Sequence, residues 1–111
     1  FYDAAEQFYH GFMVGMLGGL GEYLLRSNRE AGNGRPDILM VPEDECGTVL
    51  IFELKHVEKY NRMESGCDAA LFQIKEKQYD IECREDGFTK FIKYGICFYK
   101  KSCRVKSVIE G

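Results

Sequence analysis

Two short apolar segments, residues 36–41 and 48–55, constrain the fold of this chain more than any other feature. Isoleucine, leucine, valine and phenylalanine fill them almost without interruption, and only the polar stretch 42–47 separates them. Short runs bounded by polar turn residues are typical of β-strands. Because these runs are nearly continuous, we expect strands that are covered on both faces. Helices must then lie on both sides of the sheet, which predicts an α/β fold with a central mixed sheet.

The segments before this pair predict a helix and a strand. Residues 3–20 have the spacing of a helix that ends at a group of glycines. Its expected apolar face is Phe8, Phe12 and Met16, with Met13 and Leu17 beside them. Residues 22–29 then predict a strand, and the stretch 31–34 predicts a turn because it contains two glycines.

The second half of the chain predicts another helix and a closing hairpin. After the charged stretch 56–66, one apolar helical face is formed by Cys67, Ala70, Leu71, Ile74 and Ile81. Asp86 and Gly87 end this helix, and residues 91–99 and 104–109 predict two strands around a turn at 100–103. The expected order is therefore helix, three strands, helix, two strands.

Length and composition limit the chain to one domain. The chain has 111 residues, of which 45% are hydrophobic, and this is enough for one core. We therefore expect residues 1–111 to form a single domain. No apolar run reaches the roughly 18–20 residues that span a bilayer, and no signal peptide is visible. Five cysteines form no CxxC pair, so we expect reduced thiols and a cytoplasmic protein. Because the first residue is Phe1 and the first helix is entered partway, we expect a C-terminal piece of a longer polypeptide.

Two carboxylates stand where the central strands should meet. A hairpin with its loop centred near Glu45 pairs residues whose numbers sum to 90, which places Asp37 opposite Glu53. Directly opposed residues have Cβ atoms about 4.5–5.5 Å apart. Two carboxylates so placed in an apolar sheet repel one another, and a divalent cation such as Mg²⁺ removes the conflict. The simpler alternative is a carboxylate at a turn and an exposed strand charge.

Lys55 adds a cation to this arrangement. It lies two residues after Glu53, so both side chains point to the same face of the strand, while Leu54 points to the other. An ammonium group beside a metal ion can orient or deprotonate a water molecule, or stabilise negative charge in a transition state. These residue types at this spacing suit hydrolysis of a phosphodiester.

The same residues resemble a known family signature. Pro36-Asp37, fifteen intervening residues and Glu53-Leu54-Lys55 resemble the signature of the PD-(D/E)XK nuclease superfamily. The wider pattern resembles a branch that forms the C-terminal domain of bacterial proteins with an N-terminal AAA-ATPase-like domain. It consists of residues 27–30, 34–38, 52–55 and 94–96.

The resemblance implies a fold, an activity and further site residues. It implies a restriction-endonuclease-like αβββαβ core and cleavage of nucleic acid with Mg²⁺ or Mn²⁺. We expect the substrate to be DNA rather than RNA. The backbone carbonyl of Leu54 is then a third metal ligand, beside Asp37 and Glu53. Glu6 on the first helix and Gln73 on the second are supporting catalytic residues, whereas Tyr79 is expected to face elsewhere.

Charge leaves alternatives open. The net charge is −3, unusual for a protein that binds nucleic acid, although residues 55–111 carry twelve Lys and Arg against nine Asp and Glu. A nuclease-like fold that binds nucleic acid or protein without turnover is one alternative, and a homo-oligomerisation domain is another. The basic hairpin provides either phosphate contacts or solubility through Lys90, Lys93, Lys100, Lys101, Arg104 and Lys106. Glu30 and Arg35 either assist the site or are turn charges, and His10 either assists the site or is a core-edge or surface histidine.

Overall fold

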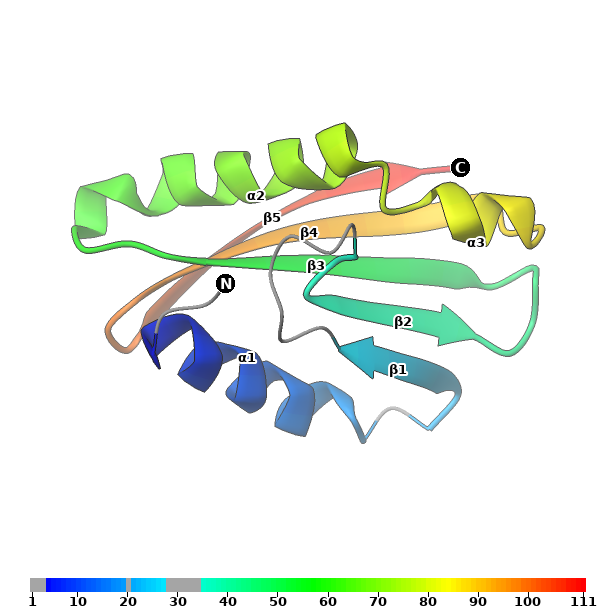
Figure 1. The fold of residues 1–111 in the computed structure, drawn as a ribbon, viewed down its shortest axis with the longest axis horizontal. Helices are drawn as coiled ribbons and strands as arrows, with labels where there is room; N and C mark the ends of the chain where they lie inside the picture. The colour runs from blue at the N-terminus through cyan, green and yellow to red at the C-terminus, as the bar shows by residue number, and fades with distance from the viewer. Residues whose placement is uncertain (1–3, 20, 28–34) are drawn as a thin grey trace.

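One mixed five-stranded sheet forms the centre of the protein (Figure 1). The structure is a computed structural model and describes residues 4–19, 21–27 and 35–111. Strand order follows the sequence; β3 and β4 are parallel, and the other neighbours are antiparallel. The elements are α1 (Ala4–Leu17), β1 (Tyr23–Ser27), β2 (Ile38–Pro42), β3 (Thr48–His56), the 3-10 turn η1 (Tyr60–Arg62), α2 (Met63–Lys77), α3 (Ile81–Glu85), β4 (Lys90–Tyr99) and β5 (Ser102–Glu110).

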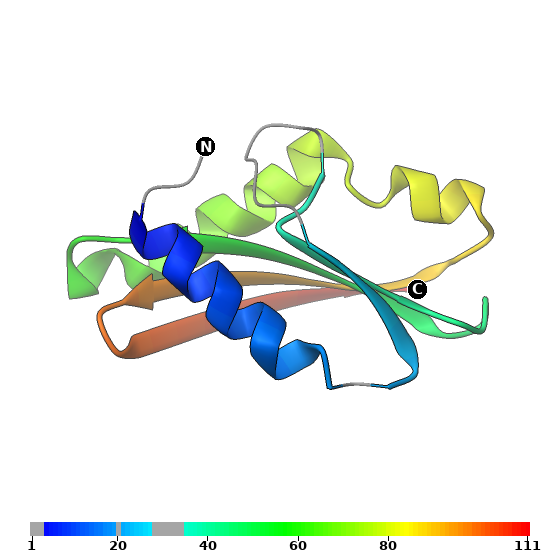
Figure 2. The same ribbon diagram turned by 60° about the horizontal axis from the view of Figure 1, so that its bottom comes forward.

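Helices cover both faces of the sheet, as the continuous apolar runs predict (Figure 2). On β3, Phe52 and Leu54 pack under α1, whereas Val49 and Ile51 pack under α2. The complete burial of a side chain such as Ile51 contributes about 1.5–3 kcal/mol. The predicted α/β class, the mixed sheet and the order of the main elements are confirmed. No helix among the described residues is long and apolar enough to cross a membrane.

The hairpin of β2 and β3 has the predicted register. Its three paired positions, Ile38 with Phe52, Leu39 with Ile51 and Met40 with Leu50, all have numbers that sum to 90. Strand limits differ from the prediction by a few residues, and the predicted glycine turn at 31–34 lies outside the described residues. The register follows from the short polar loop and from the need to bury both strands.

The predicted apolar face of α1 is wrong for Phe8, Phe12 and Met16 and right for Met13 and Leu17. Phe8, Phe12 and Met16 are 68%, 54% and 61% exposed, whereas Tyr9, Met13, Val14 and Leu17 pack on the sheet. The helix is apolar on nearly every side, so two stripes with the same four-residue spacing compete. Spacing alone does not choose between them. The second stripe also brings the buried His10 towards the sheet.

The second helix is shorter than predicted. α2 ends at Lys77, and Gln78 adopts a left-handed conformation with φ 52°. The N–H of Gln78 donates to the carbonyl of Lys75 at 3.2 Å, and the N–H of Tyr79 donates to that of Ile74 at 3.4 Å. These two bonds and the packing of Tyr79 with Ile74 form a Schellman motif. Ile81, predicted on the buried face of α2, instead begins α3 and is 48% exposed.

Close contact between α2 and β4 depends on Gly95. A Cβ atom at this position would lie 2.5 Å from the carbonyl oxygen of Cys67 and 3.0 Å from Leu71. The absence of a side chain therefore allows α2 to lie directly on the sheet. This packing fixes the distance from α2 to the neighbouring strand β3 and to the side chains that β3 presents.

Candidate metal centre and active site

The candidate site lies where β2 and β3 diverge. Their ladder ends at the pair of Ile38 and Phe52, one residue before Asp37 and Glu53 would face each other. Beyond this point the carboxylates replace backbone partners. The N–H of Leu54 donates to Oδ2 of Asp37 at 2.8 Å, and the N–H of Asp37 donates to Oε1 of Glu53 at 3.2 Å. Each carboxylate is therefore held by the backbone of the opposite strand.

Both carboxylates are buried and electrostatically unfavourable. Asp37 is 5% exposed and Glu53 is 3% exposed. Burial raises the pKa of Asp37 to about 6, against the opposing effects of the Leu54 N–H and the charge of Lys55. Burial, and then the charge of Asp37, raise the pKa of Glu53 to about 8. Near neutral pH the pair therefore retains a proton unless a cation compensates its charge.

Lys55 connects this pair to α2. It lies two residues after Glu53 on β3, and its Nζ donates to Oε1 of Gln73 at 2.6 Å. Nε2 of Gln73 in turn donates to the hydroxyl of Tyr79 at 3.1 Å. The structure thus brings together four of the predicted site residues, Asp37, Glu53, Lys55 and Gln73.

Tyr79 belongs to this network, so the prediction that it faces elsewhere is wrong. Burial raises the pKa of its hydroxyl, and the charges of Glu53 and Asp37 add to the effect. The left-handed turn at Gln78 is the reason, because it directs Tyr79 back along α2 towards Gln73. The only signal in the sequence was that Tyr79 lies near the C-terminal end of the predicted second helix. Because residue 78 is a glutamine and not a glycine, its type did not predict the turn.

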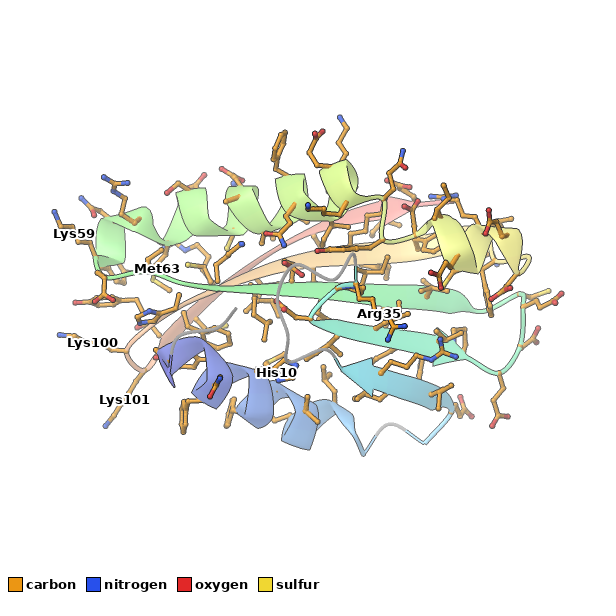
Figure 3. All side chains as sticks on the ribbon, in the orientation of Figure 1. His10, Arg35, Lys59, Met63, Lys100 and Lys101 are labelled. Atoms are coloured by element: carbon orange, nitrogen blue, oxygen red, sulfur yellow. The ribbon has the colours of Figure 1, made fainter. Side chains whose placement is uncertain are left out.

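His10 reaches the site from the opposite face of the sheet. It is 1% exposed, and its Nε2 lies 3.1 Å from the backbone carbonyl oxygen of Asp37. Figure 3 shows its side chain pointing from α1 towards the sheet. From the sequence, His10 was expected either to assist the site or to be a core-edge or surface histidine. In the structure it is a buried contact between α1 and the residue that begins the hairpin.

The remaining candidate residues are Glu6, Glu30, Arg35 and the basic residues of the hairpin. The side chain of Glu6 and all of Glu30 lie outside the described residues. Arg35 is exposed (Figure 3). With Pro36 and Tyr79 it lines a cavity of about 430 Å³. Half of the basic hairpin is engaged with carboxylates, through Lys93 to Glu110, Arg104 to Glu64 and Lys106 to Asp68.

The donor set of the site fits a hard divalent cation. Mg²⁺ binds through one or two carboxylates and fills its remaining positions with water and substrate phosphate. Asp37 and Glu53 supply two carboxylates whose pKa values are raised chiefly by burial, so a bound cation would stabilise their ionised forms. Within the described parts of the chain, no cluster of three or more His, Cys, Asp or Glu side chains could hold a metal.

Comparisons with known proteins agree with this geometry. A family model described as the PD-(D/E)XK nuclease superfamily matches residues 4–108. The comparisons with curated proteins and with solved structures gave no match. The matched range includes α1, strands β1 to β4, most of β5, and the residues Asp37, Glu53 and Lys55. The chain therefore belongs to the PD-(D/E)XK nuclease superfamily.

Proposed function

We propose that this domain is a metal-dependent nuclease that hydrolyses phosphodiester bonds of nucleic acid. The observation that carries the proposal is the buried pair of Asp37 and Glu53, each held by the backbone of the opposite strand, with Lys55 beside it. Burying two carboxylates together costs free energy. A function that requires cation binding explains why the fold retains them.

In this proposal each residue has a defined role. Asp37, Glu53 and the backbone carbonyl of Leu54 hold Mg²⁺ or Mn²⁺. The ion would neutralise charge on the phosphate and increase the acidity of a coordinated water molecule. Lys55 orients the attacking water or stabilises the charge that develops on the phosphate.

Gln73 and Tyr79 position the lysine. Gln73 accepts a hydrogen bond from Lys55 and donates one to Tyr79, so its amide has a fixed orientation. The amide holds the ammonium group without neutralising it, because its oxygen carries no formal charge. Lys55 thus keeps its full charge for the substrate. Glu6 is proposed as a supporting carboxylate from α1.

The finer assignments also belong to this proposal. DNA is proposed as the substrate in preference to RNA. The resemblance described for the sequence suggests an AAA-ATPase-like domain in a bacterial parent chain, and the cysteine pattern suggests a cytoplasmic setting. A homodimer is a further prediction, which sedimentation would test.

The test is cleavage by the purified domain. Plasmid and single-stranded DNA are incubated with it in the presence of Mn²⁺, and products are resolved on gels. Glu53→Gln and Asp37→Asn should abolish cleavage, whereas Glu43→Gln, an exposed carboxylate in the β2–β3 loop, should not. Cleavage by either site variant at the parental rate would refute the assignment. Calorimetry that detects no binding of Mn²⁺ or Mg²⁺ would favour the alternative of a catalytically silent binding module.

A further inference from the structure

We propose that the sugar–phosphate backbone of the nucleic acid leaves the active site across one basic end of the molecule. The surface consists of Lys59, Arg62, Lys100 and Lys101, and we call it the end patch. This inference rests on the proposed function, since it names where the substrate of that site lies. It adds a binding surface that the arrangement of Asp37, Glu53 and Lys55 does not itself define.

A pocket connects the active site to the end patch. It has a volume of about 420 Å³ and lies between the end of β3 and the beginning of α2. Lys55, Lys59 and Arg62 are all among the residues that line it. The lysine that belongs to the catalytic arrangement therefore shares one concave surface with two of the patch cations. A chain of phosphates that contacts Lys55 has a continuous path to them.

Aromatic contacts join the two halves of the end patch. The ring of Tyr60, next to Lys59, meets that of Tyr99, next to Lys100, with centroids 6.0 Å apart. Tyr9 stacks on His56, a wall of the pocket, and its hydroxyl donates to the carbonyl of Lys100 at 2.6 Å. The β4–β5 turn is thus fixed beside the pocket. Figure 3 shows Lys59, Lys100 and Lys101 projecting from the same end of the molecule.

Most hairpin cations outside the end patch are paired with carboxylates. Lys93, Arg104 and Lys106 form ion pairs, whereas Lys90, at the opposite end of β4, forms none within the described residues. None of the four patch residues forms an ion pair with any carboxylate in the described ranges. In a chain with a net charge of −3, unpaired cations gathered at one end create a local positive potential. Such a surface attracts phosphates despite the acidic total.

The conformation of Lys100 provides independent support. Its φ is 53°, in the left-handed region that glycine occupies at no steric cost and other residues occupy at a cost. The first residue of the tight β4–β5 turn is a position where glycine would fit better. Within the fold, the Lys100 ammonium group contacts the ring of Tyr99 at 5.3 Å. The retention of a strained lysine at the tip of a turn is explained if its positive charge binds a ligand.

The test compares two double variants with the same loss of charge. Lys59→Gln/Lys100→Gln removes two patch cations. Lys75→Gln/Lys90→Gln removes two exposed lysines, from α2 and from the opposite end of β4. Binding of the 111-residue chain to fluorescein-labelled single-stranded and duplex DNA is measured by anisotropy in EDTA, over a range of salt concentrations. The patch variant should bind about tenfold or more weakly at low salt, with the salt slope reduced by about 1.4–1.8. The control variant should match the parent chain.

A third variant separates binding from folding. Lys100→Gly relieves the left-handed strain, so its Tm should equal or exceed that of the parent chain while its affinity for DNA falls. Equal affinities for the patch and control variants, or parental affinity of Lys100→Gly, would overturn the inference. If the parent chain cleaves DNA but the affinity for DNA does not depend on the end patch, this inference fails and the proposed function stands. If binding depends on the patch but Mn²⁺ produces no cleavage, the nuclease assignment fails instead.

Discussion

Replacing Glu53 with glutamine should remove much of the pH dependence of the stability of the metal-free domain. Glutamine keeps an oxygen for the N–H of Asp37, which donates to Glu53 at 3.2 Å. Its amide NH₂ also takes the place of the hydroxyl of a protonated carboxyl group. The variant therefore imitates neutral Glu53 at every pH. Any difference between the two proteins measures the cost of ionising this buried carboxyl group.

The size of the effect follows from the pKa of Glu53. Its rise from 4.5 to about 8 corresponds to ~5 kcal/mol for full ionisation, at about 1.4 kcal/mol per unit. The folded pKa lies above the unfolded value, so the folded chain binds more protons between these values. Its free energy of unfolding therefore falls as the pH rises through that window. At pH 8 half of the Glu53 groups are still protonated, so the loss expressed by then is ~4 kcal/mol.

Urea unfolding followed by circular dichroism measures this difference. Titrations in EDTA between about pH 5 and about pH 8 should show the parent losing several kcal/mol, a large part of an ordinary domain's stability. The Glu53→Gln variant should lose less, retaining the contribution of Asp37, whose pKa rises from 3.8 to about 6. Glu43→Gln, with the same change of charge at an exposed position, should follow the parent. Parallel curves for the parent and Glu53→Gln, or a parent more stable at pH 8 than at pH 5, would refute the reasoning.

Three further predictions concern the metal, the packing of α2 and the network around Lys55. Mn²⁺ should raise the Tm of the parent chain more at pH 8 than at pH 5, because the carboxylates bind it in their ionised form; equal increments in thermal melts would contradict this. Gly95→Ala should lower the free energy of unfolding by ~1–3 kcal/mol, because the new Cβ meets the carbonyl of Cys67 at 2.5 Å. Urea titration checks this against Gly11→Ala, where a Cβ meets nothing within 4 Å. Tyr79→Phe should lower the free energy of unfolding by about 1 kcal/mol and slow cleavage without abolishing it. An unchanged rate in a plasmid assay would show that Tyr79 does not help to position Lys55.

The sequence predicted the hairpin of β2 and β3 because three constraints agreed there. The loop is short, both strands must be buried, and a slip of one residue would turn the apolar side chains of both strands to the wrong faces. The register observed for Ile38 and Phe52 follows from this agreement. The close approach of Asp37 and Glu53 follows in turn, because they occupy the next position along the same hairpin. Local pattern and turn length suffice when they leave only one arrangement.

Other parts of the site could not be predicted in this way. On α1, two apolar stripes with equal spacing left the choice of face to tertiary packing, so Phe8 was placed on the wrong side of the helix and the sequence did not decide how deeply His10 is buried. At the end of α2, the turn depends on a left-handed Gln78, a residue type that carries no strong signal for that conformation. Tyr79 enters the site only because of that turn. Both errors arise where several local structures are nearly equal in free energy and distant contacts decide.

The divergence of β2 and β3 explains why this fold can hold two buried carboxylates at all. If the ladder continued past Ile38 and Phe52, backbone groups would satisfy one another and the acids would have no donors. Because the strands separate, the N–H of Leu54 requires an acceptor, and Asp37 supplies it at 2.8 Å. By accepting this bond, the Asp37 carboxylate lowers the free-energy cost of leaving the ladder open. The N–H that the open ladder leaves available in turn lowers the free-energy cost of burying the carboxylate. Asp37→Asn should therefore preserve the hairpin, since an amide oxygen still accepts this bond, while it removes the charge that a cation requires.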